Sequence, residues 1–223
     1  MRIEYLGRLG AVLLLMAAVG HLFAPSASAA IPLGGGAGIV IEGSYCTLTT
    51  IGHDNTGELV GITAATCGGV GSQVVAEGTN DTVGTVAAAD PNLDYAVITF
   101  DSAKVTPLAN FAGFAINGLG PDPGPGQPIC TQGGATGFNC GYVKFGGRPD
   151  IIAAGMPAWQ PGDNGAPITV DDLLVGMTRK GFTGLVGPPP HLSTHISFEL
   201  FSAILGDING KGGPGAGFFP VGA

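Results

Sequence analysis

Basic residues are scarce in this sequence: 8 Lys and Arg stand against 16 Asp and Glu, and the formal net charge is −8 at pH 7. The few basic residues form no run, and the overall field repels phosphate groups. We therefore expect no binding to nucleic acid. Long apolar segments are scarce as well, since the run over residues 9–19 is too short to span a bilayer and no segment of spanning length follows.

Residues 1–29 have the pattern of an export signal. Arg2 and Arg8 precede the apolar run, and Ala27-Ser28-Ala29 has the small-x-small form that signal peptidase recognises. A membrane anchor is the alternative interpretation. We expect removal of this segment, no stable membrane insertion afterwards, and a protein that is secreted, extracellular or associated with the cell wall.

The four cysteines do not have the spacing that is typical of a metal site. They form no C-x-x-C pair, and no histidine stands at ligand spacing, so we expect disulfides, no metal and no cofactor; zinc is the less favoured alternative. Four cysteines allow three pairings. We favour the pairing of sequence neighbours, Cys46–Cys67 and Cys130–Cys140, because each bond closes a short loop and contributes about 2–4 kcal/mol.

Helical periodicity is nearly absent, and short β-branched segments separated by turn residues predict an all-β fold. We expect an N-terminal β unit over 30–115, a Gly/Pro-rich connector over 116–128, and a C-terminal β unit with a closing helix over 129–210. The helix is expected in the stretch 194–213, where apolar residues recur every three or four positions from Ile196 to Ile208. Thr194 or Ser197 would cap this helix and Gly210 would end it, and residues 211–223 would form a flexible tail.

Three separated segments carry a resemblance. They are "GITAATCGG" (61–69), "NLDYAVITF" (92–100) and "PGDNGAP" (161–167), and two further segments, "CTQGGATGFNCGYV" (130–143) and "LLVGMTRKG" (173–181), fit the same order. In this combination the chain resembles the chymotrypsin-like (trypsin-like) serine proteases, in particular the secreted bacterial branch of streptogrisins and alpha-lytic protease. The resemblance implies two antiparallel six-stranded β-barrels with a cleft between them and a C-terminal helix, and it supports the cysteine pairing.

The resemblance also locates the positions of a Ser-His-Asp triad, and two of the three differ. Asp94 keeps the aspartate, Thr66 stands where the histidine would precede the cysteine, and Asn164 stands at the nucleophile. A threonine hydroxyl is far too weak a base, and a carboxamide cannot form an acyl-enzyme. Only the backbone N–H groups of Gly162 and Asn164 would remain, as an oxyanion-hole-like pair.

Other residues near these positions have structural interpretations. We expect Asp94 to make a structural hydrogen bond with Thr66, and Asp163 to have a structural partner of its own. His53, His191 and His195 are expected in loops or at the helix start, without catalytic roles. Arg179 and Lys180 follow the strand that borders the substrate pocket; they are expected to face solvent, whereas inward-pointing side chains would narrow the pocket.

Three functions are compatible with this pattern. The favoured one is a secreted protease homologue that is catalytically inactive and binds a peptide, a protein or a cell-wall component. The second is a weak or non-standard serine-type endopeptidase. The third is an exported structural or antigen-like protein with a relic protease fold.

Overall fold

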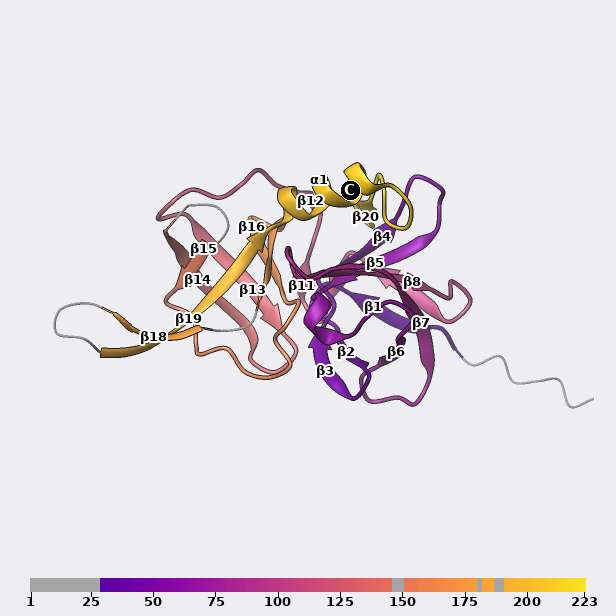
Figure 1. Ribbon diagram of the computed structural model, residues 1–223, viewed down its shortest axis with the longest axis horizontal. Coiled ribbons are helices and arrows are strands. Elements are labelled where there is room, and N and C mark those ends of the chain that lie inside the picture. The colour runs from indigo at the N-terminus through magenta and orange to yellow at the C-terminus, as the bar shows by residue number, and fades with distance from the viewer. Residues whose placement is uncertain (1–28, 146–150, 180–181, 187–190) are drawn as a thin grey trace, which may run out of the picture.

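The computed structural model describes residues 29–145, 151–179, 182–186 and 191–223, and places the chain in two β-rich halves side by side, with one helix across the top (Figure 1). The predicted export signal lies outside the described residues, apart from Ala29, and so does Lys180. Within the described part, no helix has both the length and the apolar character needed to cross a membrane.

The N-terminal half is an eight-stranded curled sheet with the order β20-β4-β5-β8-β7-β6-β2-β3. Its pairings are antiparallel, and a separate parallel pair, β1-β9, lies beside it. The strands and the short helix of this half are β1 Ile31–Gly34, β2 Gly38–Ile41, β3 Ser44–Thr47, β4 Thr50–His53, β5 Leu59–Thr63, the 3-10 helix η1 Ala65–Cys67, β6 Gln73–Ala76, β7 Thr82–Asp90, β8 Tyr95–Phe100, β9 Val105–Leu108, β10 Asn110–Phe111 and β11 Phe114–Ala115.

The C-terminal half contains a closed six-stranded barrel. The order β17-β16-β13-β14-β15-β19 closes because β17 also pairs with β19, while β12 and β18 extend the sheet. Its elements are β12 Gly118–Leu119, β13 Pro128–Gly133, β14 Gly137–Phe145, β15 Ile151–Ala154, β16 Pro167–Val170, β17 Leu173–Thr178, β18 Phe182–Val186, β19 His191–Leu200 and the helix α1 Phe201–Lys211. The last strand of the chain, β20 Phe219–Pro220, returns to the N-terminal sheet. The all-β fold with a C-terminal helix is therefore confirmed; the N-terminal sheet curls without closing by hydrogen bonds.

Each half has its own apolar core, which the alternation of buried residues along the strands produces. The larger core lies in the N-terminal half and includes Ile39, Ile62 and Ile98, all fully buried. The smaller core fills the C-terminal barrel with Ile129, Val143, Ala153, Ile168, Val175, Ile196, Phe198 and Leu200.

The helix is shorter than the sequence pattern predicted. The stretch from His191 to Leu200 is strand β19, and α1 begins only at Phe201. No side chain caps its start, where Leu200 stands, and it runs through Gly210 to end before Gly212. The prediction failed because buried residues of the strand, such as Ile196 and Leu200, continue by chance the spacing of the helical face.

Residues 212–223, expected to be flexible, are packed against the N-terminal half. Strand β20 pairs with β4, with Phe219 opposite His53. Phe218 is buried, and its ring lies 6.2 Å from that of Phe201. The end of the chain therefore joins the helix to the N-terminal sheet.

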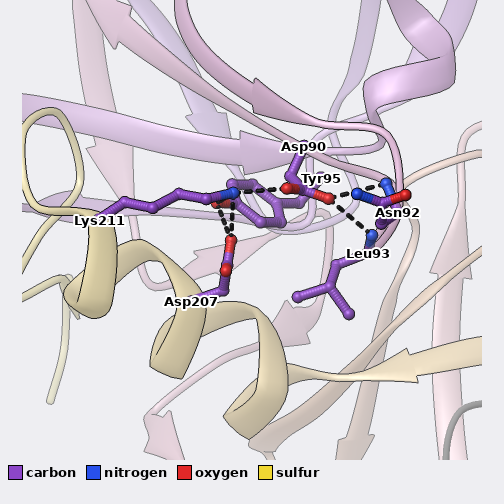
Figure 2. A network of polar contacts seen from close by, with 6 residues as sticks. All are labelled: Asp90, Asn92, Leu93, Tyr95, Asp207 and Lys211. Carbon is purple, nitrogen blue, oxygen red and sulfur yellow. Dashed lines mark hydrogen bonds and ion pairs between the residues drawn. The ribbon is translucent and has the colours of Figure 1, made fainter.

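A polar network fixes the end of α1 to the turn between β7 and β8 (Figure 2). The Lys211 ammonium lies 2.5 Å from Asp90 and 2.7 Å from Asp207, and the Tyr95 hydroxyl donates to Asp207 at 2.6 Å. Asp90 also accepts the backbone N–H groups of Asn92 and Leu93. The network thus ties the helix to the turn that leads into Asp94.

Both predicted disulfides are present. Cys46–Cys67 links β3 to η1 in the N-terminal half, and Cys130–Cys140 joins opposite residues of the β13–β14 hairpin. The cysteines of the first bond are buried.

Candidate functional site

Asp94 and Thr66 lie next to each other and are joined by a hydrogen bond from the Thr66 backbone. Asp94 is buried at the start of β8, and its carboxylate accepts the backbone N–H of Thr66 at 2.9 Å. Its own carbonyl accepts the N–H of Ala65. Burial raises the pKa of the Asp94 carboxyl, while hydrogen bonds from Thr66 and the charge of Arg179 partly oppose this rise. Thr66 itself is exposed, so the histidine-equivalent position offers only a solvated hydroxyl.

Asn164 lies in a loop held against the N-terminal half by backbone bonds. Its carbonyl accepts the N–H of Thr47 at 2.9 Å, and the carbonyl of the following Gly165 accepts the Thr49 hydroxyl at 2.5 Å. Gly165 has φ +85°, and a Cβ there would lie 2.4 Å from the Thr47 carbonyl oxygen, so the close approach requires glycine. The loop therefore meets the ends of β3 and β5, from which η1 and Thr66 continue.

The Asn164 side chain brings no nucleophile to this place. Its carboxamide oxygen is buried and accepts no hydrogen bond from the described residues. The backbone N–H groups of Gly162 and Asn164 likewise donate to no hydrogen bond within the described part of the chain.

Asp163, whose partner the sequence left open, holds the nucleophile loop in place. It is buried, and one carboxylate oxygen accepts the N–H groups of Ala135 and Thr136 at 3.1 and 3.0 Å. The other accepts the N–H of Gln160 at 2.9 Å. The loop is therefore tied to the turn of the disulfide-closed β13–β14 hairpin.

Thr47 adds a second tie between the same hairpin and the loop. Its hydroxyl donates to the carbonyl of Gly162 at 2.7 Å and accepts the N–H of Gly134 at 2.8 Å. A small cavity of about 120 Å³ opens beside this contact, between Tyr45 and Cys46 on one side and Gly162 and the hairpin turn on the other. Gly162 and Glu77 are among the residues that line this cavity.

Arg179 points inward, in contrast to the expected solvent-facing orientation. Its guanidinium lies 3.2 Å from the buried carboxylate of Glu199 and 3.4 Å from the carbonyl of Asn92 in the N-terminal half. The side chain thus spans the two halves, and its charge partly opposes the rise that burial causes in the pKa of Asp94. Sequence analysis missed Glu199, because a single acidic residue in an apolar stretch gave no indication of this partner.

The histidines lie elsewhere. His53 is at the far end of the β4–β5 hairpin, with its ring centroid 5.8 Å from that of Phe219. His191 and His195 belong to β19, in the segment that pairs with β18. Among the described residues, no group of three or more His, Cys, Asp or Glu side chains could hold a metal ion.

Solved structures with the same architecture are proteases. The Nocardiopsis protease NAPase is 19% identical, with a TM-score of 0.65 over 80% of this chain and 97% of that chain. The chymotrypsin of Cellulomonas bogoriensis is 24% identical (TM-score 0.61; 80% and 97% covered), and the alpha-lytic protease homolog N4 is 20% identical (TM-score 0.63; 80% and 98% covered). The fold is therefore that of the bacterial chymotrypsin-like serine proteases, as the resemblance implied.

Comparisons at the level of sequence give less. No protein family model matches the chain. The tRNA N6-adenosine threonylcarbamoyltransferase of Neurospora crassa is 31% identical over 87 residues, which are 34% of this chain and 25% of that protein. The match thus spans a quarter of that protein's length, and we draw no functional conclusion from it.

Proposed function

We propose that this protein is an exported, non-catalytic member of the chymotrypsin-like fold that binds a peptide or protein segment at the degenerate protease site. The observation that carries the proposal is the residue types Thr66 and Asn164 at the positions that the sequence resemblance assigns to the base and the nucleophile, with Thr66 hydrogen-bonded to Asp94. Two buried disulfide cysteines and a leader-like segment over 1–29 support export.

The chemistry of these residues argues against turnover. A hydrolytic triad needs a base that takes a proton from the nucleophile, and Thr66 has no group with a suitable pKa. The Asn164 carboxamide has a delocalised nitrogen lone pair and cannot act like a serine alkoxide. Loss of triad members costs on the order of a million-fold in turnover, and backbone donors alone give about 10³–10⁴ over water.

The same site keeps features that suit binding. The N–H groups of Gly162 and Asn164 have no acceptor within the described residues, and the adjoining cavity of about 120 Å³ lies between the two halves. Unpaired donors beside a cavity favour a ligand that brings carbonyl oxygens, which a peptide supplies at every residue. This favours a peptide or protein over a cell-wall carbohydrate as the ligand.

Active-site labelling tests the absence of catalysis. A fluorophosphonate probe is expected to leave the purified protein unlabelled, and a Thr66→His/Asn164→Ser double variant, which restores base and nucleophile, serves as the comparison. The Thr66→His single variant is the matched control and should stay unlabelled for want of a nucleophile. Labelling of the unmodified protein would instead support a non-standard serine-type endopeptidase, and peptide hydrolysis abolished by Asn164→Ala would show that the site is catalytic.

A further inference from the structure

A second groove, of about 490 Å³, lies where the two halves meet. One wall is formed by β1 and the start of β2, including Pro32 and Gly38, and the other by the hairpin turn 132–137. None of Thr66, Asp94 and Asn164 lines it, and it shares Glu77, Gly134 and Ala135 with the smaller cavity beside Gly162. Its volume falls within the range of about 300–1,000 Å³ that is usual for ligand sites.

Among the described residues that line this groove, Glu77 alone is ionisable. It is exposed, and its carboxylate forms no ion pair within the described part of the chain. The carboxylate lies over Gly38, where a Cβ would lie 1.7 Å from Oε2. The rest of the lining is uncharged and includes aliphatic residues and Phe111.

The turn that forms the opposite wall is held by three hydrogen bonds from its backbone N–H groups to side-chain oxygens. Gly134 donates to the Thr47 hydroxyl, and Ala135 and Thr136 donate to Asp163. With the hairpin also closed by a disulfide, this wall is in place before any ligand arrives, which lowers the cost of binding.

We propose that this groove is a docking site for an extended peptide segment that carries a lysine or arginine side chain. The methylene groups of such a side chain would contact the apolar lining while its charge pairs with Glu77. The formal net charge of −8 on the chain favours the approach of a cationic segment. A peptide with an acidic side chain in the same place would be repelled by Glu77.

A ¹H–¹⁵N NMR titration tests this inference. The probe is acetyl-Ala-Ala-Lys-Ala-amide, added to a final concentration of about 10 mM. This concentration allows weak binding, with a dissociation constant in the millimolar range, to be measured. We expect saturable shifts at the amides of Gly36, Gly38 and Gly133, which line the groove. The same peptide with norleucine in place of lysine is expected to bind more weakly, because it keeps the methylene groups and lacks the charge.

Two variants test whether the charge of Glu77 contributes to binding, and the pattern of shifted amides distinguishes the groove from the smaller cavity beside Gly162, which Glu77 also lines. Glu77→Gln should weaken binding about threefold or more, since an exposed ion pair contributes modestly. Glu58→Gln removes the same charge from the β4–β5 hairpin and should leave affinity unchanged. The inference is overturned by the absence of saturable shifts at the groove, by equal affinity in Glu77→Gln, or by shifts confined to 162–164, which would place the peptide in the protease-like site.

Discussion

Asp94 is a buried carboxylate that is held by backbone hydrogen bonds at the start of β8. In this chain the carboxylate accepts the backbone N–H of Thr66, lies near Arg179 and is buried. Its backbone has φ +49°, a left-handed conformation in which asparagine and aspartate are enriched. An asparagine can therefore adopt the same conformation and still accept the Thr66 bond.

Replacement of Asp94 by Asn is expected to increase stability at neutral pH. Because burial raises the pKa of Asp94 in the folded state, the folded protein binds this proton more tightly than the unfolded chain. The stability from the neutral carboxyl is present below the unfolded pKa and is lost as pH rises through the folded pKa. In urea titrations, the free energy of unfolding of Asp94→Asn should therefore rise relative to that of the unmodified protein as the pH increases from 3 to 7.

The opposite result has a definite meaning. A loss of stability in Asp94→Asn at pH 7 would show that the ionised carboxylate, paired with the Arg179 charge, is the favoured state. The Asp101→Asn variant is a suitable control, because Asp101 is exposed and follows the other end of β8.

At the scale of elements, the sequence predicted the strands of both halves and the relation between Asp94 and Thr66, because alternation and ordered motifs depend on local residues. It did not predict where β19 becomes α1, since Ile196 and Leu200 fit either period. The inward orientation of Arg179 depends on Glu199 and on Asn92, 87 residues away along the chain. Such a contact follows only from the packing of the two halves.

The attachment of α1 to the β7–β8 turn gives a prediction at the same scale. The hydrogen bond from Lys211 lowers the pKa of both Asp90 and Asp207, and these two carboxylates raise the pKa of Lys211. Burial and then Asp207 raise the pKa of Tyr95 to about 12. Near neutral pH all three ion-pairing groups are therefore charged, as the geometry in Figure 2 requires.

Lys211→Met is expected to lower the melting temperature at pH 7 and to have less effect in acid. Carboxylates with a lowered folded pKa contribute stability above their ordinary value near 3.8, and this contribution is lost as pH falls through the folded pKa. Circular dichroism melts at pH 7 and pH 2.5 measure the difference. Lys104→Met, which removes a cation that lies 3.8 Å from Asp101, is the matched control; equal losses in both variants at pH 7 would contradict a specific role for Lys211.

At the scale of the whole molecule, the last residues of the chain connect the two halves. After α1 the chain returns to the N-terminal sheet, where β20 covers the edge of β4 and the N–H of Val221 donates to the carbonyl of Ile51. An uncovered sheet edge would expose unpaired backbone groups and favour association with other chains. The tail therefore protects the edge of β4 and belongs to the folded core.

Two neighbouring phenylalanines in this tail, one buried and one exposed, test whether the tail contributes to the core. Phe218 is buried in the N-terminal core against Phe201, whereas Phe219 is 51% exposed. Phe218→Ala should lower the free energy of unfolding by about 3–5 kcal/mol, the usual cost of emptying a buried aromatic site. Phe219→Ala, the control, should cost far less in the same urea titration. Similar small losses in both variants would mean that the tail is not part of the core; a large loss in Phe218→Ala alone would mean that residues 212–223 are needed to hold helix and N-terminal sheet together.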